Sequence, residues 1–524
     1  MPTIEIALPS AEGVSDTALE KELRKKLQIL PGDKLQFRII KKSLDARSKN
    51  IKLVFLVEYV LNGELAPANF EKRKWQNVNN AKPVAIIGAG PAGLFAAIQL
   101  IELNYKPVII ERGKTVRDRR RDLAAINKQR IINPNSNYCF GEGGAGTYSD
   151  GKLYTRSTKR GNVQRILYTL VECGANENIL IETHPHIGTN KLPQIIETMR
   201  DKILACGGEF IFNTQFTGFA KNGNTISGVQ LSDVQSQHAF VLECSAVILA
   251  TGHSARDVYQ HFYDNRYHIE CKPFALGVRI EHPQHIIDSV QYHCEVRPDN
   301  LPPAAYSLAY TDNNNRGTYS FCMCPGGIIA PAATAPGELV VNGWSPSRRN
   351  NPFANSGMVV NIMEEDLKDF AHHGELRALY FQKHIEQQSF IAGGENLTAP
   401  AQRLTDFLSD KHSATLPVCS YIPGITSVDL KNIFPTQITN ALKEGLKVFG
   451  KKMPSYITSE AVLVATESRT SSPVRIPRHA ETLMHTNLKG LFPCAEGAGY
   501  AGGIVSAAID GERCADAVRN YFDA

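Results

Sequence analysis

Three glycines are the residues of this sequence whose spacing most specifically indicates a chemistry. Gly88, Gly90 and Gly93 form a Gly-x-Gly-x-x-Gly pattern between an apolar run at 84–87 and a second apolar run at 94–100. This order predicts a strand that turns directly into a helix. In such a turn the first glycine permits a tight bend, the second lets the backbone approach a pyrophosphate, and the third lets helix and strand pack closely. The pattern therefore predicts a dinucleotide site.

An acidic residue follows at the distance that such a site requires. A second apolar strand at 107–110 ends in Glu111, eighteen residues beyond the last of these glycines. There the fold places a carboxylate on the adenosine ribose hydroxyls. Pro91 and Ala92 open the intervening helix, whose N-terminus presents unpaired N–H groups and a positive dipole end to phosphates. We assign these residues, with the neighbouring Arg112, to a cofactor site.

Three further segments, at 140–147, 250–254 and 490–504, are built mainly from small residues. Each alone is equally compatible with an ordinary turn, but together they suit one extended cofactor, with phosphates at one end and a ring at the other. A helix that opens at Ile504 can aim its N-terminus at an electron-rich ring edge and stabilise charge there. The candidate cofactor contacts in these segments are Gly144, Thr147, Thr251, Gly252, Glu496, Gly502, Gly503 and Ile504.

Two basic residues are the candidates for catalysis. Lys152 follows the 140–147 loop and would support negative charge near a bound ring, the alternative being a surface salt bridge that involves Asp150. Arg469 borders a Ser/Thr-rich loop and would bind a substrate carboxylate or phosphate, with a structural ion pair as the equal alternative. His253 is interpreted as a polar loop residue rather than as a proton-transfer group.

Two cysteines, Cys322 and Cys324, lie two residues apart on an expected strand. Their side chains would face the same way, about 7 Å apart at a rise of about 3.3 Å per residue, which is too far for an unstrained disulfide. We therefore predict buried structural thiols. The sequence contains no zinc-ligand spacing, Ser-His-Asp order or Walker loop, and we predict no metal site.

The expected elements arrange these residues in three domains of the α/β class. Residues 1–75 form a small N-terminal α/β domain, and a polar linker at 71–82 overlaps its end. Residues 82–266 and 455–524 form a Rossmann-like nucleotide-binding domain, into which residues 267–454 are inserted as a mixed β/α substrate or cap domain.

Local patterns predict the individual elements. In the N-terminal domain we expect strands at 3–8, 34–41 and 50–59 and a helix at 15–27. The nucleotide-binding domain is expected to contain helices near 117–121 and 192–206 and strands at 209–213, 225–231, 239–244 and 246–252. In the inserted domain we expect a hairpin of 305–310 and 318–324, a strand at 339–345, and helices at 375–390 and 435–449, before the chain returns to the nucleotide-binding domain through a strand at 461–467.

Composition and charge limit the classes of protein to which the chain can belong. The 524 residues are 43% hydrophobic, no run approaches about 18 uninterrupted apolar residues, and the start lacks the features of a signal peptide. Eleven scattered cysteines suit reduced thiols, so we expect a cytoplasmic protein without a membrane span. Segment 20–52 carries eleven Lys/Arg against four Asp/Glu. That excess suits a solvated surface or an anionic partner such as RNA, and no aromatic platform favours nucleic acid.

Several stretches resemble the bacterial family of uncharacterised FAD-dependent (NAD(FAD)-utilising) dehydrogenases. They are 140–153, 251–257, 272–283, 321–327, 467–476 and 494–511. The resemblance implies FAD, with pyrophosphate at Gly88, Gly90 and Gly93, ribose at Glu111, and adenine near Thr214 to Phe216. It also implies groups close to the flavin, namely Gly144, Thr147, Glu496, Gly503 and Ile504. Glu496 stands where Asp is commoner, which weakens its expected contact to the ribityl chain or pyrophosphate.

The resemblance implies an FAD-dependent oxidoreductase with noncovalent flavin. It would transfer a hydride to or from a small organic substrate bound between the two larger domains. Residues 207–453 contain no second glycine fingerprint, so NAD(P)H is retained only as a candidate transient reductant. The alternatives are a flavin-dependent RNA-modifying enzyme that uses the basic N-terminal domain, and a nonenzymatic escort with a flavoprotein fold.

Overall fold

The N-terminal segment folds as a small antiparallel sheet with one helix. The computed structural model describes residues 1–10, 15–67, 71–155 and 160–524. β1 (Thr3–Pro9), β3 (Lys52–Leu61) and β2 (Leu35–Asp45) pair in that order, and α1 (Asp16–Lys26) shares their core. Ser15 caps α1 by accepting a hydrogen bond from the Ala18 N–H at 3.1 Å. The order and type of all four elements confirm the prediction.

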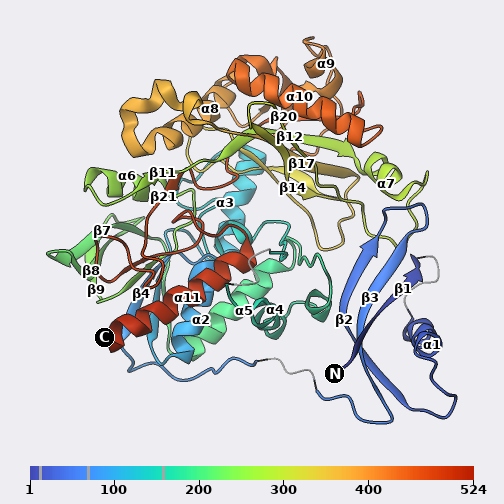
Figure 1. Cartoon of the computed structure of the whole chain (residues 1–524). Helices are drawn as coiled ribbons and strands as arrows, with labels where there is room; N and C mark the ends of the chain where they lie inside the picture. Colours follow the sequence, from blue (N-terminus) through green and yellow to red (C-terminus); the bar gives the residue numbers. More distant parts are fainter. Residues whose placement is uncertain (11–14, 68–70, 156–159) are drawn as a thin grey trace.

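A parallel sheet carries the glycine fingerprint. Its strands, in spatial order, are β22 (Leu491–Pro493), β10 (Val247–Leu249), β4 (Pro83–Ile87), β5 (Lys106–Ile110) and β6 (Glu209–Ile211). One side is covered by α2 (Pro91–Glu102), α5 (Leu192–Ala205) and α11 (Ile504–Asp523) (Figure 1). The other side is covered by the antiparallel sheet of β7 (Thr214–Asn222), β8 (Thr225–Asp233) and β9 (Ala239–Glu243).

Residues of β4 show how the sequence builds these layers. Val84 and Ile86 belong to the core under α2 and α11, whereas Ala85 and Ile87 belong to the core under β7–β9. Successive strand residues point to opposite faces, so a strand that is covered on both sides must be apolar throughout. The run 84–87 meets that requirement, and the predicted order of strand, turn, helix and strand is confirmed.

A second, larger sheet of seven strands lies above the first in Figure 1. Its spatial order is β13 (Ala309–Thr311), β14 (Gly317–Cys324), β17 (Phe353–Asn361), β12 (Ala275–Pro283), β20 (Val462–Glu467), β18 (Ala399–Arg403) and β19 (Ile425–Ser427). α8 (Arg377–Ala392) and α10 (Thr436–Lys452) cover the face directed away from α2 and α11 (Figure 1). The predicted hairpin is the antiparallel pair β13–β14, with a shorter first strand than expected.

The sequence suggested that the strand at 461–467 returns the chain to the nucleotide-binding domain. In the structure this strand does not join the parallel sheet. β20 pairs with β12 on one side and β18 on the other, so it is an interior strand of the seven-stranded sheet. The reason is that its run of buried residues suits an interior strand of either sheet, and the sequence does not choose between them. The chain therefore leaves this sheet only after Glu467, and the proposed limits of the three domains remain predictions there.

The remaining elements connect these sheets and helices. The helices are α3 (Val116–Gln129), α4 (Val163–Glu172), α6 (Arg256–Asp264), α7 (Gln284–Tyr292), α9 (Leu404–Leu408), η2 (Gly144–Gly146), η3 (Glu177–Leu180), η4 (Glu364–Leu376) and η5 (Leu430–Asn432). The strands are β11 (Glu270–Cys271), β15 (Ile328–Pro331), β16 (Val341–Trp344) and β21 (Val474–Arg475). The sequence did not predict β7, whose pairing with β8 shifts register twice. Within the described residues, no helix has the length and apolarity to cross a membrane.

Candidate functional site

A cavity of about 600 Å³ lies at the carboxyl ends of the parallel strands. The turn after β4, the loop 139–154, the end of β10 and the segment before α11 form most of its wall, and residues after β5, in β7, α6, β14 and β16, and at 469–470 complete it. The residues in its wall that the sequence predicted as cofactor contacts are Gly88, Gly90, Pro91, Ala92, Glu111, Arg112, Gly144, Phe216, Thr251, Gly252, Glu496, Gly502, Gly503 and Ile504. Segments far apart in the chain thus meet in one pocket at the edge where α/β sheets bind ligands.

Two predicted contacts lie behind this wall. A Cβ on Gly93 would overlap the backbone oxygen of Gly88, so Gly93 serves the close packing of helix on turn. Thr147 is fully buried, and its hydroxyl donates to the Glu142 carbonyl at 2.8 Å within its own loop. The hydroxyl shapes the loop, whereas the sequence had assigned it to the cofactor. A hydroxyl beside glycines suits either role, so sequence alone did not separate them.

The first two fingerprint glycines meet different surroundings. Gly88 has a φ of +107°, and a Cβ there would overlap the backbone oxygen of Ala250 at the end of β10. A Cβ on Gly90 would find no atom nearer than the Gly144 Cα at 4.0 Å. Gly90 therefore faces open space beside the first turn of α2, whose N–H groups have no partner within the helix. This cradle fits a phosphate group.

Glu111 holds the neighbouring loops together. Its carboxylate accepts hydrogen bonds from the backbone N–H groups of Ala89, Gly113 and Gly141, each at 2.9 Å. A carboxylate offers about four acceptor positions, so one remains for a ribose hydroxyl. The Arg112 guanidinium lies 4.4 Å from the centre of the Phe140 ring and pairs with Asp257. Phe216 and Phe140 add aromatic surface to this end of the pocket.

The N-terminus of α11 also reaches the pocket, through Gly503 and Ile504. Gly503 precedes this helix and provides no side-chain cap, so the N–H groups of its first turn are directed to the cavity wall without a partner in the helix. Among the described residues, the Thr251 hydroxyl oxygen is buried without a hydrogen-bond partner. A buried hydroxyl in that state is unfavourable unless a ligand bonds it. Both observations fit a cofactor that spans the pocket.

Lys152 lies in the pocket wall as part of a charged cluster. Its ammonium is 3.1 Å from an Asp150 carboxylate oxygen, which also accepts a hydrogen bond from Arg349 at 3.0 Å. Burial alone would raise the pKa of Asp150, but the charges of Lys152 and Arg349 outweigh burial and hold that pKa at about 2. The salt bridge considered from the sequence is present, although it lies in the pocket wall and not on the outer surface.

The two cysteines of β14 meet at the same ammonium. Lys152 Nζ lies 3.6 Å from Cys322 Sγ and 3.5 Å from Cys324 Sγ, and the Cys324 thiol donates a hydrogen bond to the Cys322 carbonyl at 3.3 Å. The expectation of a regular strand is wrong. Cys322 has a φ of +47°, and the pairing of β14 with β17 shifts between Phe321 and Cys324. Cys322 consequently lines the pocket, while Cys324 is fully buried.

Arg279 fixes the backbone at this break in the strand. Its guanidinium is fully buried, donates to the Cys322 carbonyl at 2.9 Å, and pairs with Glu467 at 3.1 Å. A third bond, at 3.0 Å, reaches Asn355 on β17. Arg279 is thus an ion-paired support for Cys322, and no sequence pattern signals this contact.

Arg469 reaches the pocket wall with its hydrogen-bonding groups already in use. It donates to Ser254 at 3.1 Å and Thr334 at 2.8 Å, and pairs with Glu386 at 3.1 Å and Glu338 at 3.3 Å. No donor direction of this planar group is left for a substrate carboxylate. The geometry favours the structural ion pair over the catalytic role.

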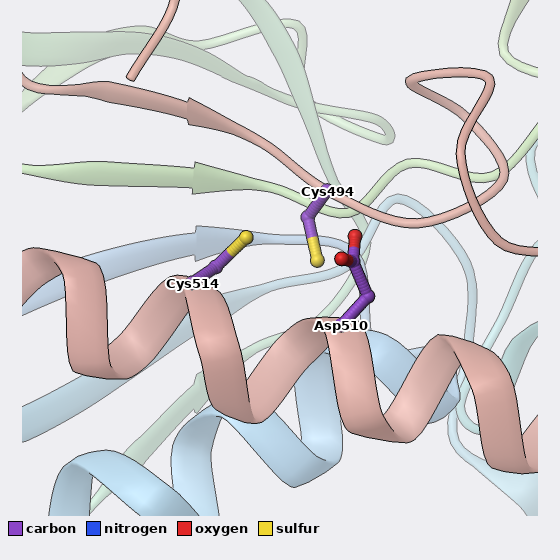
Figure 2. Close-up of side chains that lie close together, drawn as sticks. All are labelled: Cys494, Asp510 and Cys514. Atoms are coloured by element: carbon purple, nitrogen blue, oxygen red, sulfur yellow. The ribbon is translucent and has the colours of Figure 1, made fainter. Parts of the chain in front are cut away.

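Cys494, Asp510 and Cys514 form a buried group whose candidate ligand atoms lie within 4.8 Å of one another. Figure 2 shows Cys494 pointing toward α11, which carries the other two residues. Asp510 already pairs with both terminal nitrogens of Arg478, at 2.9 and 2.7 Å, and Arg478 also donates to Cys514 at 3.5 Å. The guanidinium supplies the positive charge that a metal ion would bring, so we assign this group a structural role joining β22 to α11.

Known proteins similar to this chain were identified by sequence and by structure. An uncharacterised protein from Clostridium beijerinckii is 39% identical, and the match covers 96% of each chain. Residues 273–470 match the family described as "FAD-dependent protein, C-terminal domain-like", and residues 1–60 match a domain of unknown function (DUF8436).

Two solved structures of flavoproteins resemble this chain with low TM-scores. A glycerol-3-phosphate dehydrogenase from Bacillus halodurans complexed with FAD is 11% identical, with a TM-score of 0.37 over 85% of this chain and 66% of that one. A flavoprotein/dehydrogenase from Cytophaga hutchinsonii is 10% identical, with a TM-score of 0.36 over 84% and 79% of the two chains.

Proposed function

The chain belongs to the bacterial family of uncharacterised FAD-dependent dehydrogenases, and from that premise we propose that it binds FAD noncovalently in the 600 Å³ pocket and transfers a hydride to or from a small organic substrate. The observation that carries the proposal is the meeting of four glycine-rich segments and two helix N-termini around one cavity. FAD, when bound, supplies the two-electron chemistry.

The chain's own residues divide the binding of FAD between the two ends of the pocket. Gly90 and the first turn of α2 hold the pyrophosphate, Glu111 accepts from the ribose, and Phe216 contacts the adenine region. The flavin end lies between the loop at Gly144 and the N-terminus of α11, where the helix dipole stabilises negative charge on the ring.

We propose that the substrate binds beside Lys152, where Phe321 and Asn342 complete the pocket wall. The Lys152 ammonium offers a positive charge and a proton to this end of the cavity. Asp150 and Arg349 hold the lysine in place through the ion pairs described above. NAD(P)H remains a candidate reductant, and anaerobic bleaching of the flavin absorbance by NADH or NADPH is the test of that part of the proposal.

The basic N-terminal segment gives no specific support to the RNA-modifying alternative. Arg24 pairs with Glu20, Arg38 with Glu58 and Arg47 with Asp45, as expected of a solvated surface that balances part of its own charge. We therefore propose the oxidoreductase alone.

The test of the proposal combines cofactor content with a variant that fills the pocket. The purified protein should carry about one FAD per chain, released intact by denaturation as a noncovalent cofactor must be. Gly90→Leu places a side chain in open space, so it should fold and lack FAD. Gly32→Leu is the matched control, because a Cβ at Gly32 also meets no atom within 4 Å but lies far from the pocket. A Gly90→Leu protein that keeps FAD would contradict the assignment.

A further inference from the structure

The cysteine pair of β14 differs from the other thiols in its combination of access and charge. Cys322 lines the pocket, Cys324 lies behind it at zero exposure, and Lys152 approaches both sulfurs at 3.5–3.6 Å. At the irregular backbone of Cys322, the Cys324 thiol donates to the Cys322 carbonyl at 3.3 Å, and both sulfurs lie beside the same ammonium. An accessible thiol with a buried partner is the arrangement in which one sulfur attacks and the other resolves.

The surroundings also shift the pKa values of the two thiols in opposite directions. The neighbouring Cys324 thiol lowers the pKa of Cys322, burial opposes it, and the charges of Lys152 and Arg279 lower it further, against the nearby Asp150. For Cys324, the neighbouring Cys322 side chain and burial both raise the pKa. The thiolate is the reactive form of cysteine, so the accessible member of the pair is the activated one.

We propose that Cys322 and Cys324 are a redox-active dithiol that exchanges an electron pair with FAD bound in the same pocket. Oxidation joins the two Sγ atoms, releases the remaining thiol proton of Cys324 to solvent or to a neighbouring base, and passes two electrons to oxidised FAD. The reverse step takes two electrons from reduced FAD and one proton, which restores the Cys322 thiolate beside Lys152 and the Cys324 thiol. This inference rests on the proposed FAD site.

The chain contains a matched control pair. The thiols of Cys494 and Cys514 also lie within 4.8 Å of each other and beside a cation, Arg478, but both are fully buried and neither lines the cavity. If contact between thiols were enough, both pairs would oxidise. If opening onto the flavin pocket is required, only Cys322 and Cys324 will.

The experiment counts electrons and thiols together. Oxidised holoprotein is titrated anaerobically with dithionite, then alkylated and digested with trypsin, which leaves both cysteines of the pair in the peptide 317–348. We expect four electrons per FAD in the wild type and two in Cys324→Ser. Peptide 317–348 should gain two alkylation sites on reduction, while Cys494 and Cys514 stay reduced throughout.

The possible results separate this proposal from the proposed function. Two electrons per FAD, with 317–348 fully alkylated even after treatment with oxidised dithiothreitol, would overturn the dithiol and leave the FAD site standing. A protein that forms the disulfide but binds no FAD would overturn both the FAD site and the coupling.

A positioning role for Lys152 has its own readout. The pH midpoint of Cys322 alkylation should rise in Lys152→Met and return toward the wild-type value in Lys152→Arg. An unchanged midpoint in Lys152→Met would show that the lysine does not activate the thiol.

Discussion

Gly88 and Gly90 lie two residues apart in one turn. Replacing Gly88 by alanine should lower the stability of the fold, whereas replacing Gly90 by alanine should weaken cofactor binding. At Gly88 the new Cβ overlaps the Ala250 oxygen, and the backbone has a φ of +107°. At Gly90 the nearest atom to the new Cβ is 4.0 Å away. The first substitution should therefore damage the protein without ligand, and the second should damage ligand binding.

The magnitudes follow from these surroundings. At Gly88, a left-handed conformation costs an L-residue about 1–2 kcal/mol and overpacking costs about 1–3 kcal/mol, so the flavin-free protein should lose about 2–5 kcal/mol. At about 2–4 °C per kcal/mol for a domain of about 150–250 residues, Tm should fall by about 4–20 °C. At Gly90, the helix N-cap prefers Gly to Ala by about 0.5–1 kcal/mol. Intrusion into the FAD site should weaken FAD binding by about 1–3 kcal/mol, or about 5- to 150-fold in Kd.

The assay measures Tm of the flavin-free proteins and the Kd of FAD by quenching of flavin fluorescence. The reasoning is refuted if Gly90→Ala lowers Tm as much as Gly88→Ala, or if it binds FAD as tightly as the wild type. A Gly88→Ala protein with unchanged Tm would show that the contact with β10 is not as close as the structure places it.

Three further predictions concern buried charges. Arg469→Met removes one of the two cations that pair with the buried carboxylates of Glu338 and Glu386, while Arg256 stays paired with both. It should destabilise the protein by about 1.5–3 kcal/mol, the usual value of hydrogen bonds to charged groups. Arg475→Met, at a half-exposed pair, should cost under about 1 kcal/mol, and denaturant unfolding compares the two variants. The pKa of Asp150 is lowered from 3.8 to about 2, which gives roughly 2 kcal/mol of folding stability. This stability is present above about pH 4 and is lost as the pH falls through about 2. In a series of Tm measurements against pH, Asp150→Asn should not show this loss of stability in acid. Burial raises the pKa of Glu281 from 4.5 to about 7. The contribution of its protonated carboxyl to folding stability is therefore complete below pH 4.5 and is lost as the pH rises through about 7. Glu281→Gln should therefore flatten the fall of Tm between pH 5 and 8, and an unchanged slope would contradict the assignment.

The glycine fingerprint could be predicted because its chemistry is local. The spacing of Gly88, Gly90 and Gly93, the flanking apolar runs and Glu111 together specify strand, turn, helix and strand, and the structure confirms that order. The candidate contacts gathered in one cavity for the same reason, since the carboxyl ends of parallel strands meet at one edge. Gly93 and Thr147 lie behind the wall: Gly93 packs helix on turn, as its place in the fingerprint predicts, and the Thr147 hydroxyl bonds within its own loop.

The parts that escaped prediction depend on distant partners. β20 is buried on both faces, so its sequence suits either sheet, and only its pairing with β12 and β18 decides. The positive φ of Cys322 occurs in a run that reads as a regular strand, with Arg279 holding the carbonyl at the break. No sequence pattern in residues 317–324 indicates this contact, and the two cysteines were therefore predicted to be buried structural thiols.

The measurement that most directly tests the central claim is amide hydrogen exchange of the flavin-free protein before and after addition of FAD. The account predicts slower exchange in four separate segments at once, 88–93, 140–147, 250–254 and 496–506, with 20–52 unchanged as the internal reference. Protection confined to one of these segments, or absent from all of them at saturating FAD, would contradict the claim that they enclose a single cofactor.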